Sequence, residues 1–315
     1  MDPVRRVVIL APGRSGSTLL QSAFLSHCDS LTFFEPCRHS PLGDVRREKC
    51  VAQVLRFLDC DLPRRNGDWD PPSIRGWLRH PYNDANTTCA QPPLRSVAQT
   101  ADRCRTAQLV LVKEIRLVGQ LALLADALQR RGRGAALSTA IVHLVRDPRA
   151  MLASQKRLHW WSLEDSLPHR QTAHELERVA AKTCHGMIAD ADAGESLQRA
   201  GRLRYIMVRF EELSSDLKAT TARVYGQLGL SVAPATQTWL QRTMGGQCNH
   251  AHVRTTNMTA NETDTYEYST CRTKTARRRR GLRWKHALTA WQKSGLMRSC
   301  AGALTRFGYI DPPRV

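Results

Sequence analysis

Val7-Val8-Ile9-Leu10-Ala11 and the turn that follows it, Pro12-Gly13-Arg14-Ser15-Gly16-Ser17-Thr18, decide the fold of this 315-residue chain. An unbroken apolar run rich in β-branched residues is typical of a parallel strand buried on both faces. Small residues let the turn fold tightly around an anion, and a helix expected at 18–27 would point its N–H groups and dipole at that anion. The stretch therefore predicts a buried strand that leads into a phosphate-binding loop.

Strand and helix patterns alternate through the rest of the chain. Further strands are expected at 31–34, 109–112, 141–145 and 205–208, and helices at 46–58, 117–131, 148–158, 172–197 and 217–228. This order predicts an α/β fold, a P-loop-like parallel β-sheet with helices on both faces. We expect a single domain over residues 5–312, with a long polar loop at 245–283 and a last helix at 288–307.

The predicted loop departs from the triphosphate-binding pattern G-x-x-x-x-G-K-[ST]. Ala11 stands at the first glycine, and Ser17 stands at the lysine. Because that lysine is the usual partner of β- and γ-phosphates, we expect a loop that binds phosphate but does not handle the γ-phosphate of ATP, with Arg14 supplying the charge. An ordinary Gly/Ser turn is the alternative for the loop taken alone.

A second motif, Arg146-Asp147-Pro148-Arg149-Ala150-Met151-Leu152-Ala153-Ser154, also follows a predicted strand. Arg146 ends the strand, and Ser154 lies eight residues later in the next helix. Ligands of parallel sheets bind at the carboxyl ends of the strands, so this guanidinium and hydroxyl would hold a second phosphate there. The alternative is a salt bridge between Arg146 and Asp147, followed by a proline that opens the helix.

Composition points to an anionic partner and an oxidising compartment. The net charge of +19 fits nucleic acid, an acidic glycan, an anionic membrane or a multiply phosphorylated nucleotide, and a basic surface kept for solubility is the plain alternative. Ten cysteines without a C-x-x-C pair favour disulfides over a zinc or redox site. Sequons at Asn86, Asn257 and Asn261 agree with a lumenal surface.

The two phosphate motifs together resemble the signature of the PAPS-dependent sulfotransferase superfamily, where PAPS is 3′-phosphoadenylyl sulfate. The first is similar to its 5′-phosphosulfate loop, R-S-G-[ST]-[ST], and the second to its 3′-phosphate site, R-D-P-R-x-x-x-x-S. The resemblance implies PAPS as co-substrate. The binding residues that it implies are Gly13, Arg14, Ser15, Gly16, Ser17, Thr18 and Leu19 in the first motif, and Arg146, Asp147, Pro148, Arg149 and Ser154 in the second.

Further segments are similar to those of the Golgi carbohydrate sulfotransferases that act on galactose, GalNAc or GlcNAc. Their F-E-P-x-x-H segment resembles Phe33-Phe34-Glu35-Pro36 with His39, and their K-x-x-R strand end resembles Lys113-Glu114-Ile115-Arg116. Their W…C…G-Y ending resembles Trp284, Cys300, Gly308 and Tyr309. The resemblance implies direct in-line transfer of a sulfuryl group to a 6-hydroxyl of a glycan or proteoglycan, with acceptor-specificity insertions around 61–105 and 159–200.

Three residues are expected to carry the reaction. Glu35 lies 21 residues after Arg14, the offset of the glutamate base in related tyrosylprotein sulfotransferases, and is the expected general base. Lys113 and Arg14 are expected to stabilise charge on the moving group. The alternatives are a salt bridge from Glu35 to Arg14 or Arg38, a solvated Lys113 and, for His39, a structural histidine. In-line transfer requires no metal, and we expect none.

The densest positive charge of the chain lies near its C-terminal end. The tract Arg277-Arg278-Arg279-Arg280, with Arg283 and Lys285, is expected to close over the nucleotide or bind an acidic glycan, and a solvated loop or a nucleic-acid patch is the alternative. Thr18-Leu19 replaces the family's commoner Ser-Phe.

Family members are type II membrane proteins of the Golgi lumen. The run 7–11 is too short to be an anchor, so we expect that the natural N-terminus is missing. A non-catalytic heparin- or nucleic-acid-binding protein and a P-loop kinase are the alternative functions. We expect a glycan as partner and no nucleic acid.

Overall fold

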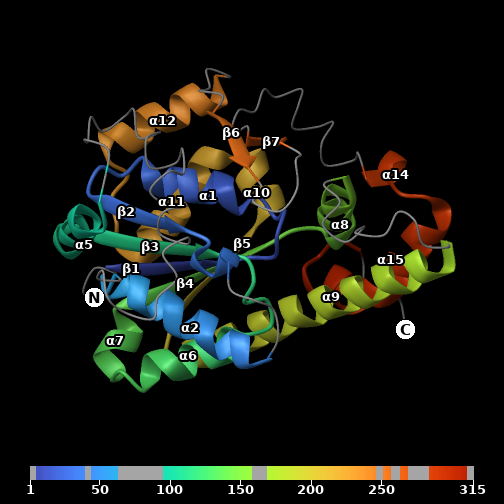
Figure 1. Cartoon of the computed structure of the whole chain (residues 1–315), viewed down its shortest axis with the longest axis horizontal. Helices are drawn as coiled ribbons and strands as arrows, with labels where there is room; N and C mark the ends of the chain where they lie inside the picture. The colour runs from blue at the N-terminus through green and yellow to red at the C-terminus, as the bar shows by residue number, and fades with distance from the viewer. Residues whose placement is uncertain are drawn as a thin grey trace.

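The computed structural model describes residues 5–39, 44–62, 94, 96–157, 169–245, 251–256, 263–268 and 284–310. Its centre is a five-stranded sheet in the order β2-β3-β1-β4-β5, and every neighbouring pair is parallel. The strands are β1 (Arg6–Leu10), β2 (Ser30–Phe34), β3 (Leu109–Glu114), β4 (Thr139–Val145) and β5 (Arg204–Arg209). The predicted parallel sheet is confirmed (Figure 1).

Helices cover both faces of the sheet, as predicted. One face packs against α2 (Asp44–Leu58), α5 (Val97–Thr106), α6 (Leu121–Gln129) and α7 (Arg133–Leu137). The other face packs against α1 (Ser17–Leu25), α10 (Phe210–Ser215), α11 (Leu217–Leu228) and α12 (Pro234–Met244). The residues of β4 are buried along its whole length because both of its faces are covered.

A third cluster lies beside the carboxyl end of β4. It joins α8 (Pro148–Arg157), α9 (His169–Arg199) and α15 (Ala290–Arg306), and Figure 1 shows α9 extending from beneath the sheet to α15. The short helix α14 (Trp284–Ala287) precedes α15. Much of the segment 159–200 is therefore α9, whose Leu176, Cys184 and Met187 are fully buried. None of the described helices combines the length and apolar character of a membrane span.

Disulfides join neighbouring elements within two of these clusters. Cys37 bonds to Cys50, Cys60 to Cys104 and Cys184 to Cys300, and Cys28 is also disulfide-bonded. No described cysteine is free, so the expectation of disulfides is confirmed for these residues. The three remaining cysteines, the sequons and the arginine tract 277–280 lie outside the described residues.

The polar loop predicted at 245–283 is wrong in part. β6 (Ala251–Thr256) and β7 (Thr263–Tyr268) form an antiparallel pair within it. These strands are rich in threonine and tyrosine, which favour extended backbone although they are not strongly apolar. A search for apolar runs therefore missed them. The helices α5, α7, α10, α12 and α14 were not predicted either.

Candidate functional site

The first motif forms a tight turn between β1 and α1. Arg14 and Gly16 both adopt left-handed backbone, with φ of 69° and 92°. A Cβ on Gly16 would lie 2.3 Å from the Phe210 ring, so only glycine fits there. Gly16 caps α1 without a side-chain hydrogen bond, and the first turn of α1 holds no acidic residue. The positive end of the helix dipole therefore faces the turn without a local counter-charge.

The second motif meets this turn in space. Nε of Arg14 donates to the Ser154 hydroxyl at 3.2 Å, and Nη1 of Arg146 donates to the Arg14 carbonyl at 2.7 Å. Gln155 Nε2 donates to the Gly13 carbonyl at 2.9 Å. The two motifs converge because β1 pairs directly with β4, which aligns their carboxyl ends. Gln155 was missed in the sequence, where nothing sets it apart from other helical glutamines.

Two polar atoms at this junction are buried and have no hydrogen-bond partner among the described residues. They are the Oγ of Ser15 and the Nε of Arg146. Burial lowers the pKa of Arg146 to about 10, which leaves it charged at neutral pH, and its guanidinium lies 4.3 Å from the centre of the Phe210 ring. A buried donor without an acceptor costs about 1–3 kcal/mol. Both atoms are therefore suited to an anion that supplies the missing acceptors.

Asp147 and Arg149 pair with each other and with the C-terminal segment. The Arg149 guanidinium donates to both Asp147 oxygens and to the Tyr309 carbonyl. The backbone N–H of Asp147 donates to Glu211, whose other oxygen accepts the Tyr309 hydroxyl at 2.9 Å. These contacts hold the second motif against α10 and residue 309. Glu211 was missed because its partner Asp147 is distant in the sequence.

The remaining residues of the two motifs sit on helices. Ser17, Thr18 and Leu19 begin α1, and Pro148 begins α8. The Leu19 side chain packs in the apolar core, so only its backbone is available to a ligand. The side chain of Ser17 is also buried.

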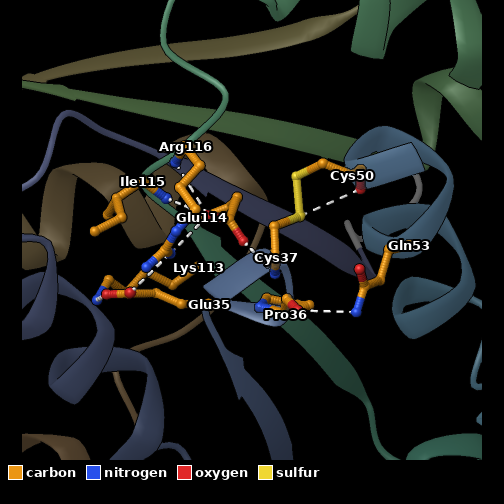
Figure 2. A network of polar contacts seen from close by, with 9 residues as sticks. All are labelled: Glu35, Pro36, Cys37, Cys50, Gln53, Lys113, Glu114, Ile115 and Arg116. Atoms are coloured by element: carbon orange, nitrogen blue, oxygen red, sulfur yellow. Dashed lines mark hydrogen bonds and ion pairs between the residues drawn. A yellow bond between two sulfur atoms is a disulfide. The ribbon is translucent and has the colours of Figure 1, made fainter. Parts of the chain in front are cut away.

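The expected reaction centre lies at the ends of β2 and β3. Phe34 pairs with Lys113, and Glu35 follows directly, so its carboxylate meets the Lys113 side chain (Figure 2). Lys113 Nζ lies 2.6 Å from Glu35 Oε1, and Arg116 Nη1 lies 3.0 Å from Glu35 Oε2. Glu35 therefore forms ion pairs with Lys113 and Arg116, neither of which was among the partners, Arg14 and Arg38, named in the salt-bridge alternative. The side chains of Arg38 and His39 lie outside the described residues.

Burial and charge act against each other at this centre. Burial alone raises the pKa of Glu35, but the positive charges and hydrogen bonds of Lys113 and Arg116 outweigh it and lower that pKa to about 2. Burial lowers the pKa of Lys113, and the Glu35 charge opposes that shift. Only 2% of Lys113 is exposed, so the alternative of a solvated strand-end lysine is wrong. The site holds an ionised glutamate between two cations.

Glu114 is a further carboxylate beneath this centre and was not singled out in the sequence. It is fully buried, and its oxygens accept the backbone N–H groups of Cys37, Ile115 and Arg116. Glu114 lies near the sulfur atoms of Cys37 and Cys50 in a grouping that resembles a metal site. Those sulfur atoms form a disulfide, however, and only a thiolate is a good ligand. We therefore assign no metal to this grouping.

Comparisons with known proteins agree on one family. The sequence profile of the sulfotransferase family matches residues 6–234. Carbohydrate sulfotransferase 4 of Mus musculus is 27% identical over 291 residues, which cover 80% of this chain and 72% of that protein. Carbohydrate sulfotransferase 6 of Homo sapiens is 26% identical over 342 residues, which cover 96% of this chain and 80% of that protein.

Solved structures agree with the fold. The sulfotransferase domain from the Synechococcus PCC 7002 olefin synthase aligns with a TM-score of 0.51 and 16% identity, covering 99% of this chain and 97% of that one. The sulfotransferase domain from the curacin biosynthetic pathway aligns with the same TM-score and identity, covering 99% of each chain. At this identity the likeness concerns the fold, which is the α/β sulfotransferase fold. Since the family profile spans more than half of the sequence and includes both phosphate motifs, the chain belongs to the sulfotransferase family.

Proposed function

We propose that the chain transfers the sulfuryl group of PAPS to a sugar hydroxyl of a glycan or proteoglycan, at the 6-position of galactose, GalNAc or GlcNAc. The names of the curated relatives support a carbohydrate acceptor. The net charge of +19 suits both an anionic donor and an acidic glycan. The disulfides support an oxidising compartment, and we propose the lumen of the Golgi.

One observation carries the nucleotide part of the proposal. Arg14, Arg146 and Ser154 are joined by hydrogen bonds at one end of the sheet, beside Ser15 Oγ and Arg146 Nε, which have no hydrogen-bond partner in the described part of the chain. This arrangement offers donors for two phosphate groups, as a nucleotide with 5′- and 3′-phosphates requires. The turn 13–18 would hold the phosphosulfate, and Arg146 with Ser154 would hold the 3′-phosphate.

The chemical step assigns one role to each charged side chain. Glu35 accepts the proton of the acceptor hydroxyl while the hydroxyl oxygen forms a bond to sulfur. The bond between sulfur and the 5′-phosphate oxygen breaks, which releases the 3′,5′-bisphosphate PAP. Lys113 and Arg14 stabilise the charge on the sulfuryl oxygens and the leaving phosphate.

A carboxylate with a pKa near 2 is a weak base in the resting site. The negative charge of the bound donor would partly cancel the positive charge of Lys113 and Arg116. This would raise the Glu35 pKa at the time of transfer.

A ligand screen separates this function from its rivals. Thermal unfolding is followed with PAP, ATP or heparin, each without magnesium. We expect PAP at micromolar concentration to raise the melting temperature more than ATP does. Stabilisation by heparin alone would instead favour a binding protein without catalytic activity.

The acceptor is found by product analysis. The protein is incubated with labelled PAPS and a panel of keratan, chondroitin and mucin-type glycans, and the labelled sugar and its sulfated position are identified. Label on a 6-hydroxyl supports the proposal. Label on another position, or on no glycan while PAP still binds, overturns the acceptor assignment and leaves the nucleotide assignment intact.

A further inference from the structure

The turn that carries Glu35 has a backbone that its own sequence does not favour. Glu35 adopts φ of 47°, in the left-handed region, just before the 3₁₀ helix η1 (Pro36–His39). For a residue other than glycine such a conformation costs about 1–3 kcal/mol and persists only where the surroundings hold it. The contacts that hold this turn therefore also determine where the Glu35 carboxylate lies.

Each residue of the turn 35–37 is bonded to a neighbouring element (Figure 2). The Glu35 N–H donates to the Lys113 carbonyl at 2.8 Å, and the Pro36 carbonyl accepts from Gln53 Nε2 at 2.8 Å. The Cys37 N–H donates to Glu114 Oε2 at 2.8 Å, and the Cys37 sulfur is bonded to Cys50. The Glu114 side chain therefore holds the turn directly, through the backbone N–H of Cys37.

The other oxygen of Glu114 reaches Glu35 by a second route. Oε1 accepts the Arg116 N–H at 3.0 Å and lies 3.4 Å from Arg116 Nη1. The same Nη1 donates to Glu35 Oε2 at 3.0 Å. Glu114 thus contacts the backbone two residues after Glu35 and also the guanidinium that grips the Glu35 carboxylate.

We propose that Glu114 is a positioning residue for sulfuryl transfer, which fixes the Glu35 carboxylate through the Cys37 N–H and the Arg116 guanidinium. The inference rests on the proposed role of Glu35 as base. Glu114→Gln replaces one acceptor oxygen with an NH2 group, so either the Cys37 N–H or the Arg116 contacts lose their acceptor. The Glu35 carboxylate then moves from its working position.

Substitution of Glu114 should lower the turnover rate and leave the affinity for the nucleotide unchanged. Glu114→Gln should lower kcat by about 10- to 100-fold, the size of effect expected from an ångström-scale misplacement of a reacting group. Its KM for PAPS and its Kd for PAP, by calorimetry, should remain within about twofold of the wild-type values, because neither phosphate motif contacts Glu114 in the described contacts.

A double-mutant cycle tests whether Glu114 acts through Glu35. We measure kcat for Glu114→Gln, Glu35→Gln and the double variant, using high enzyme concentrations for residual rates. If Glu114 positions Glu35, Glu114→Gln should lower kcat almost no further when Glu35 is already glutamine. Equal losses in both backgrounds would overturn the inference. Near-normal turnover of Glu35→Gln alone would instead overturn the base assigned in the proposed function.

Asp190→Asn is the matched control. Asp190 is another buried carboxylate that accepts backbone N–H groups, from Gly119 at 2.7 Å and Leu121 at 2.8 Å, on α9 away from this cluster. Its kcat should match that of the wild type, and a loss as large as that of Glu114→Gln would assign both effects to general damage. If Glu114→Gln does not fold, Arg116→Gln enters the same cycle, and additive losses there overturn the inference equally.

Discussion

Nε of Arg14 donates a hydrogen bond to the hydroxyl of Ser154 across 3.2 Å, although 140 positions separate the two residues in the chain. The Arg14 carbonyl accepts a further bond from Arg146. The loop after β1 and the motif after β4 are therefore one connected unit. A substitution in either motif should therefore change the affinity for the nucleotide more than the affinity for the acceptor.

Arg146→Ala and Ser154→Ala should both weaken PAP binding. Hydrogen bonds to charged groups contribute about 1.5–3 kcal/mol, so we expect Arg146→Ala to raise the Kd about 10- to 100-fold and Ser154→Ala to raise it less. Isothermal titration calorimetry measures both values. Ser196→Ala, at an exposed position of α9, is the control and should bind PAP like the wild type. Unchanged affinity in Arg146→Ala would remove the second motif from the nucleotide site.

Gly16→Ala should disrupt the turn itself. The new methyl group would lie 2.3 Å from the Phe210 ring, at a φ of 92° that alanine disfavours. We expect a loss of stability of about 1–3 kcal/mol, together with weaker PAP binding, because Phe210 also supports Arg146. Gly201→Ala is the control for backbone strain alone, since its φ is 62° and nothing lies within 4 Å of the added atom. Equal PAP affinities in the two variants would contradict this prediction.

Glu35→Gln should nearly abolish transfer from labelled PAPS while leaving PAP binding intact. Glutamine fills the same space but has no carboxylate to accept a proton, and loss of a general base costs about 100- to 10,000-fold in rate. Turnover is measured with the acceptor that the glycan panel identifies, and PAP binding is measured by calorimetry. A rate close to the wild-type value would exclude Glu35 as the base.

The ion pairs of Glu35 should make stability depend on pH in acid. The pKa of Glu35 falls from its ordinary value of 4.5 in an unfolded chain to about 2 in the fold. Its stabilising effect is therefore complete above pH 4.5 and is lost as the pH falls towards 2, with a magnitude of about 3 kcal/mol. Urea unfolding at stepped pH should show the stability gap between wild type and Glu35→Gln narrowing across this window. A gap that stays constant would contradict the shift.

The sheet was predictable because its strands are marked by local composition. Val7-Val8-Ile9-Leu10 is apolar throughout, and the run 141–145 is apolar except for His143, a pattern typical of strands covered on both faces. Helix α11 has the predicted bounds, Leu217–Leu228. The pair β6 and β7 was not found, since its residues are polar and its pairing joins segments whose hydropathy resembles that of a loop.

The site was predictable to the extent that its residues follow strands. Arg14, Glu35, Lys113 and Arg146 all stand at the carboxyl ends of strands, and parallel pairing brings such ends to one edge. The grip of Arg116 on Glu35 and the burial of Glu114 were not predictable in the same way. Both depend on how the turn after β2 lies against the end of β3, where Glu35 has left-handed backbone although it is not a glycine.

The bond between Cys184 and Cys300 has a practical consequence for proteolysis. It joins α9 to α15 across a sequence separation of 116. A protease that cuts the chain once anywhere between these cysteines would produce two fragments that remain covalently attached. Such a nicked molecule would migrate as an intact chain on a non-reducing gel and would separate into two bands only after treatment with a thiol reagent.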